Sequence, residues 1–140
     1  MRFWDSSALV PLLVEQESSP RAAAWLAEDA TVTVWTLTTI EVVSAFRRLV
    51  RERTLDEEVA RVAETRLEEI VRTCHVVIDV DPVKVRAARL LRVHPLRAFD
   101  ALQLGAALQW AEGHPDGRTL HTFDARLARA AEREGFVVPA

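Results

Sequence analysis

The sequence has 140 residues, of which 49% are hydrophobic, and a formal net charge of −3. This length and composition predict one folded domain with a single core, and the charge does not mark a general nucleic-acid binder. No stretch approaches the roughly 20 apolar residues of a membrane span, and no signal peptide is recognisable. The single cysteine, Cys74, excludes an intramolecular disulfide. We therefore expect a cytoplasmic protein without membrane contacts.

Short apolar stretches alternate with helical patterns along the chain. Five stretches with β-branched or aromatic residues are predicted to be strands: residues 2–4, 31–35, 75–80, 118–122 and 136–138. Between them, apolar residues spaced three and four apart predict helices.

Several helix ends are marked by the residues expected there. Residues 38–41 and 54–57 each fit a capping box, and Ser19 followed by Pro20 fits a helix start. Asp81 followed by Pro82 is expected to open another helix, and Gly135 to end the last one. Strands separated by helices predict an α/β fold with a mostly parallel sheet and helices on both faces, in one domain spanning residues 1–140.

Four acidic residues lie at the starts of predicted helices. Asp5 follows the first strand, Glu41 lies in the first turn after the second, and Asp124 follows the fourth. Asp100 lies in the first turn of a helix that has no strand directly before it. All strand-to-helix corners of a parallel sheet lie on one edge, so these carboxylates are expected to meet there. Each also has a simpler explanation, as a helix cap or as a charge that complements a helix dipole.

Carboxylates gathered at one edge would repel one another unless a cation neutralised them. Oxygen ligands without cysteine or a well-placed histidine favour Mg²⁺ or Mn²⁺, and such ions can promote hydrolysis of a phosphodiester. Ser6 and Thr122 are suited to orienting the carboxylates by hydrogen bonds.

Four segments of the sequence together resemble the PIN-domain ribonucleases, and among them the VapC toxins of toxin–antitoxin pairs. These segments are residues 5–9, 39–41, 96–102 and 122–124. The resemblance implies a three-layer αβα sandwich with a five-stranded sheet in the order 3-2-1-4-5. It also implies an endoribonuclease that cuts single-stranded regions of RNA with Mg²⁺ or Mn²⁺.

By position in this family, the metal-binding acids would be Asp5, Glu41, Asp100 and Asp124. Ser6 would be the hydroxyl beside the first acid, and Thr122 the threonine of the last motif. The resemblance further implies a homodimer and a cognate antitoxin whose C-terminal segment enters a groove, often presenting an arginine to the acids. Arg2 and Trp4 depart from the more aliphatic first strand of the family.

Other residues of the sequence allow further roles, and two other functions remain open. Arg97, one turn before Asp100, could contact substrate phosphate. The histidines His94 and His121 are expected to be structural, as are the four tryptophans, in the core or a dimer interface. One alternative function is a receiver-like signalling domain, but such domains use a lysine after the last strand, and Lys84 lies after the third. Another is a catalytically silent module that binds RNA or protein.

Overall fold

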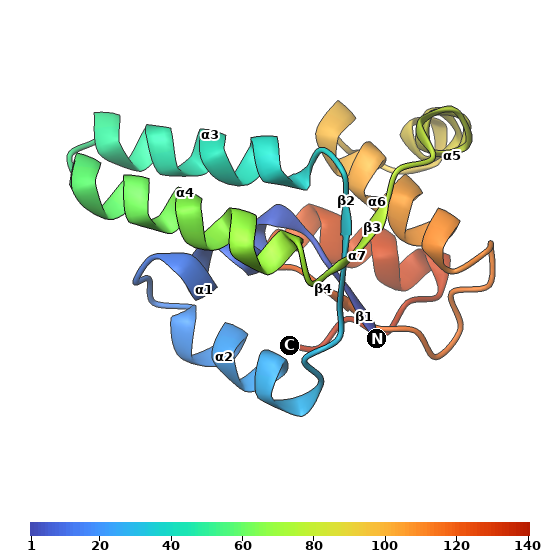
Figure 1. Ribbon diagram of the computed structural model, residues 1–140. Coiled ribbons are helices and arrows are strands. Elements are labelled where there is room, and N and C mark those ends of the chain that lie inside the picture. Colours follow the sequence, from blue (N-terminus) through green and yellow to red (C-terminus); the bar gives the residue numbers. More distant parts are fainter.

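A short parallel sheet runs through the middle of the computed structural model, which describes residues 1–140 (Figure 1). Its strand order is β3-β2-β1-β4, and each neighbouring pair is parallel. The strands are β1 (Arg2–Trp4), β2 (Val32–Trp35), β3 (His75–Val77) and β4 (Leu120–His121). This order agrees with the prediction over the first four strands.

The expected fifth strand at residues 136–138 is reduced to an isolated bridge, so the sheet has four strands and not five. Val137 pairs in parallel with Thr119, which places the C-terminal segment beside β4 where a fifth strand was expected. The pairing stops there because the next residue but one is Pro139, which has no N–H to donate.

β3 and β4 are also shorter than predicted, and β2 begins one residue later than predicted. β3 ends at Val77, and the helix after it begins at Val80, so Asp81 and Pro82 lie inside its first turn. A proline is tolerated there because N–H groups of the first turn have no partner within the helix. β4 keeps only two residues of the predicted stretch 118–122.

Seven helices cover the two faces of the sheet (Figure 1). One hydrophobic core joins Phe3 and Trp35 to the helices α5 to α7, and a second joins Trp4 and Val34 to α1 to α4. Neighbouring strand residues thus face opposite layers, which makes the three-layer sandwich. The helices are α1 (Ser6–Leu13), α2 (Ser19–Glu28), α3 (Thr38–Arg51), α4 (Glu57–Val71), α5 (Val80–Val93), α6 (Ala98–Trp110) and α7 (Ala125–Glu134). None of them has the length and apolar character needed to cross a bilayer.

The unusual residues of the first strand fit the sandwich without disturbing it. Trp4 is fully buried. Arg2 is half-buried, and its Nη1 donates to Glu28 Oε2 at 3.0 Å while its Nε lies 3.7 Å from Asp29 Oδ2. The arginine therefore ties β1 to the end of α2.

Both predicted capping boxes are wrong. The hydroxyl of Thr38 is buried and hydrogen-bonded to Gln103 of α6, and α3 has no side-chain cap. Thr54 donates to the carbonyl oxygen of Leu49, at the end of the preceding helix. Helix α4 begins after Asp56, which makes no side-chain cap bond. In both cases a different partner takes the hydroxyl that the capping box would have used: a distant side chain for Thr38 and a carbonyl oxygen of the preceding helix for Thr54. The start at Ser19 is also only partly as predicted, because Ser18 occupies the cap position and Ser19 is the first helical residue.

Helices α5 and α6 approach each other closely at Gly105. A Cβ atom there would lie 3.0 Å from the carbonyl oxygen of Val83 and 3.2 Å from the backbone nitrogen of Ala87. Such distances are shorter than ordinary contacts, so the absent side chain lets the two backbones touch.

Candidate active site

Asp5 lies at the carboxyl end of β1, where it caps helix α1. Its side chain is only 3% exposed and accepts hydrogen bonds from the Ser7 backbone N–H, from the Ser7 hydroxyl at 3.1 Å and from the Thr122 hydroxyl. The two hydroxyl oxygens also lie 3.1 Å from each other. Asp5 is thus fixed in one orientation by one residue of α1 and one residue of the loop between β4 and α7.

Glu41 lies in the first turn of α3 and is half-buried. Ser6 donates to its Oε2 at 3.1 Å, and the amide nitrogen of Gln103 donates to its Oε1 at 2.9 Å. The Gln103 amide is itself held by two hydrogen bonds with the Thr38 hydroxyl, at 3.0 and 3.3 Å. Helices α1, α3 and α6 therefore meet around this carboxylate.

The other two acids lie at the starts of helices α6 and α7. Asp100 lies in the first turn of α6 and is half-buried. Asp124 caps α7, because its Oδ1 accepts from the backbone N–H groups of Arg126 at 2.8 Å and Leu127 at 2.9 Å. The cap leaves its other carboxylate oxygen free for a ligand.

These four acids form what we call the acidic cluster: Asp5, Glu41, Asp100 and Asp124. Burial raises the pKa of Asp5 to about 6, and the charge of Asp124 adds to this effect. Burial also raises the pKa of Glu41 to about 7, with smaller contributions from Asp5 and Asp100. The pKa of Asp100 is raised by burial and by Asp124. The charge of at least one other acid thus raises the pKa values of Asp5, Glu41 and Asp100.

Among these acids, basic side chains offset the repulsion only at Asp100. Arg97 and Arg126 lower the pKa of Asp100, though burial outweighs them. Arg97 is exposed at the cap position of α6, and its side chain makes no hydrogen bond or ion pair within the chain. No cation of the protein lies against Asp5 or Glu41 closely enough to lower its pKa.

The chemistry of this cluster fits a divalent cation. Its donors are carboxylate oxygens with hydroxyl and amide groups behind them, which suit Mg²⁺ or Mn²⁺. No group of three or more Asp, Glu, His or Cys side chains is drawn tightly enough to hold an ion by itself.

Two residues of the site were missed by sequence reasoning. Gln103 lies three residues after Asp100, and this spacing puts both on one helix face, which could have revealed it. Ser7 had no such signal, because the sequence cannot tell which of two adjacent serines turns toward Asp5. Ser6, expected beside the first acid, instead donates to Glu41.

The histidines lie outside the acidic cluster. His94 Nε2 lies 2.7 Å from Glu134 Oε1 and links the end of α5 to the end of α7. His121 is fully buried and stacks on Trp25, with ring centroids 4.4 Å apart. Burial lowers the pKa of His121 to about 4, helped by the nearby Arg2.

Comparison with known proteins gives one family match. The PIN domain family matches residues 2–133 of the chain. A search of curated protein sequences finds no match.

Solved structures share the fold at low sequence identity. The structure of FitAcB from Neisseria gonorrhoeae is 20% identical, covers 100% of this chain and 97% of its own, and has a TM-score of 0.68. PAE2754 from Pyrobaculum aerophilum is also 20% identical, with 98% and 87% covered and a TM-score of 0.65. A toxin–antitoxin complex from Klebsiella pneumoniae is 16% identical, with 90% and 88% covered and a TM-score of 0.64.

Proposed function

Since the chain belongs to the PIN domain family, we propose that it is a metal-dependent endoribonuclease that hydrolyses RNA phosphodiester bonds at the acidic cluster. One observation carries the proposal. The buried Asp5 and the half-buried Glu41 have pKa values raised to about 6 and 7 within a site that also holds Asp100 and Asp124. Such a site is costly for the fold without a cation, and costly acidic sites are typical of metal-dependent catalysis.

The four acids of the cluster would hold Mg²⁺ or Mn²⁺. When bound, the ion would supply an activated water and stabilise the charge that develops at phosphorus. The remaining residues orient the acids: Ser7 and Thr122 hold Asp5 by hydrogen bonds, and Ser6 and Gln103 hold Glu41. We assign Arg97 to substrate phosphate, because it is exposed beside Asp100 and has no partner in the chain.

In the cell, this activity would serve as the toxin component of a type II toxin–antitoxin system. The fold is shared with a toxin–antitoxin complex from Klebsiella pneumoniae. The partners would be a cognate antitoxin, an RNA substrate and a second copy of the chain in a homodimer, and the protein would act in the cytoplasm. Co-purification of the chain with the product of a neighbouring gene would test this role.

The test of the chemistry is cleavage of a labelled single-stranded RNA by the purified protein with Mg²⁺ or Mn²⁺. Asp5→Asn and Asp124→Asn are expected to lower the cleavage rate about 100-fold or more, because each removes a proposed ligand. Asp81→Asn serves as the matched control, since that carboxylate is 94% exposed on α5. Equal cleavage by the wild type and Asp5→Asn would refute the mechanism. Tight, metal-independent RNA binding without product would favour the silent binding module.

A further inference from the structure

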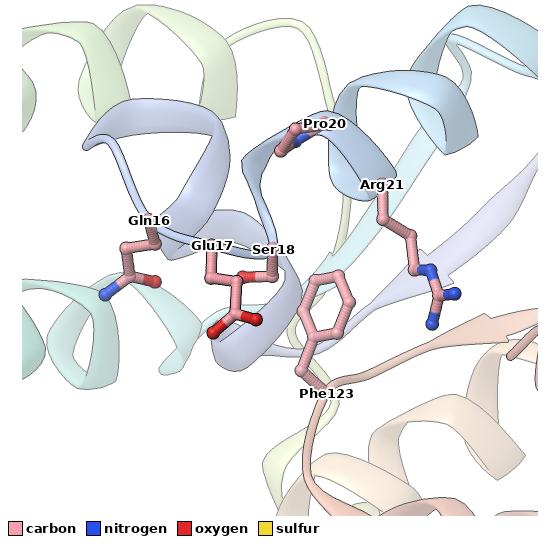
Figure 2. Close-up of a pocket in the computed structure, with 6 residues that line it drawn as sticks. All are labelled: Gln16, Glu17, Ser18, Pro20, Arg21 and Phe123. Carbon is pink, nitrogen blue, oxygen red and sulfur yellow. The ribbon is translucent and has the colours of Figure 1, made fainter.

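An open pocket of about 620 Å³ lies between the start of α2 and the loop that joins β4 to α7 (Figure 2). Five of its six lining residues come from the α1–α2 connection and the first turn of α2, and the sixth is an aromatic residue of the β4–α7 loop. The lining residues are Gln16, Glu17, Ser18, Pro20, Arg21 and Phe123.

Phe123 connects this pocket to the acidic cluster. It lies between Thr122, which donates to Asp5, and Asp124, and its own N–H donates to the Ser7 hydroxyl at 2.8 Å. Its backbone N–H thus bonds a residue that holds Asp5, whereas its half-buried ring lines the pocket. The ring is backed by Trp25, with centroids 4.6 Å apart and planes inclined by 20°. A flat aromatic surface is therefore held firmly next to Asp124 and to Thr122, the residue that donates to Asp5.

The α2 side of the pocket offers a place for an anion. The N–H of Arg21 has no acceptor in the chain, whereas the next N–H, of Ala22, bonds the Ser18 carbonyl oxygen at 3.0 Å. The Ser18 side chain makes no cap bond. The Arg21 guanidinium is exposed and has no acidic partner, and Figure 2 shows it beside the Phe123 ring. A free N–H at a helix start together with an unpaired arginine is a typical phosphate site.

We propose that this pocket binds one unpaired nucleotide of the RNA substrate, with the base stacked on Phe123 and the phosphate at Arg21 and the start of α2. The proposal rests on the proposed ribonuclease function and adds to it a subsite next to the acidic cluster. An aromatic ring combined with a positive charge is the arrangement by which proteins hold single-stranded nucleic acid. The carboxylate of Glu17 would repel a second phosphate in the pocket. It could instead accept a hydrogen bond from an amino group of the base. A base stacked inside a duplex cannot reach the ring, so the subsite selects single strands.

The proposal is tested by fluorescence anisotropy with a fluorescein-labelled single-stranded oligoribonucleotide in EDTA, where no cleavage occurs. Arg21→Gln is expected to lower the affinity about fivefold and to reduce the slope of log affinity against log salt by about 0.7, the value for one phosphate contact. Phe123→Ala should lower the affinity about tenfold or more, whereas Phe123→Tyr should retain it because the aromatic face remains. Arg92→Gln, an exposed arginine of α5, is the matched control.

The outcomes separate the subsite from the ribonuclease hypothesis. If Arg21→Gln and Phe123→Ala bind and cleave RNA like the wild type while Asp5→Asn does not cleave, the subsite is refuted and the ribonuclease stands. A pocket that serves a protein partner would give this same result. If the wild type neither binds nor cleaves RNA, both proposals fail. Thermal unfolding checks that Phe123→Ala is folded, and the exposed Arg21→Gln tests the subsite independently.

Discussion

Removing the charge of Asp5 should make the metal-free protein more stable. The Asp5 carboxylate is almost completely buried, and no cation lies against it. Replacement by asparagine keeps the size of the side chain and its acceptor for the Ser7 N–H, but abolishes the buried charge. We therefore expect Asp5→Asn to be inactive and yet more resistant to unfolding, as found when function is built from strained or repelling groups.

The size of this effect follows from the raised pKa. The Asp5 carboxyl has a pKa of about 6 in the folded chain, against about 3.9 in an unfolded one. A difference of about two pKa units corresponds to about 3 kcal/mol of lost stability above pH 6. Asparagine forfeits charge-assisted hydrogen bonds from Ser7 and Thr122, so a net gain of about 1–2 kcal/mol is expected. For a chain of this size the unfolding midpoint would rise by roughly 3–6 °C.

The sign of the pH dependence provides the sharper test. The folded chain holds the Asp5 proton more tightly than the unfolded chain, so the cost is absent below about pH 4 and is complete above about pH 6. The advantage of Asp5→Asn over the wild type should thus shrink by about 2 kcal/mol between pH 8 and pH 4.5. Urea unfolding in EDTA at both pH values measures this difference, with Asp81→Asn as control. A variant that is less stable than the wild type at pH 8, or a difference independent of pH, would refute the reasoning.

Three further predictions concern the surroundings of this site. Gln103→Leu should lower the cleavage rate about 10- to 100-fold. It should also move the acidic limb of the pH–rate profile to higher pH, because the Gln103 hydrogen bond lowers the pKa of Glu41; a limb at the same pH would contradict this positioning role. Mg²⁺ or Mn²⁺ should raise the unfolding temperature of the wild type, and EDTA should reverse it, but neither should affect a variant with Asp5→Asn and Asp124→Asn; an equal rise in both proteins would exclude these acids as ligands. The buried His121, whose pKa is lowered to about 4 from about 6.5 when unfolded, should lower the stability of the wild type relative to His121→Phe by about 2 kcal/mol between pH 7.5 and pH 5; urea unfolding measures this difference, and a difference that does not change with pH would count against the buried neutral ring.

The sheet and the meeting of the acids could be predicted because both follow from one geometric rule. Parallel strands end at the same edge, so Asp5, Glu41 and Asp124 had to approach one another once the strands were recognised. Asp100 required an additional assumption about where α6 starts. Its position depends on the packing of α5 and α6, which sequence periodicity does not report.

The local details were harder to predict, because hydroxyl groups choose among many partners. Thr38 fits a capping box but binds Gln103, which lies 65 residues away in the sequence. The prediction of a fifth strand was wrong for a similar reason. The β-branched residues around Val137 favour a strand, but Pro139 ends the pairing. In each case a tertiary contact or a missing donor outweighs the local propensity.

The bare backbone of Gly105 has a bearing on the carboxyl groups it never touches. It lies five residues after Asp100 and two after Gln103, so it sits roughly 8 Å and 3 Å along the α6 axis from them. Any larger residue would drive α6 away from α5 and carry both side chains with it, because a helix moves as a stiff rod. A single hydrogen atom in place of a methyl group thus helps to set how far apart the charges stand near the N-terminal end of α6.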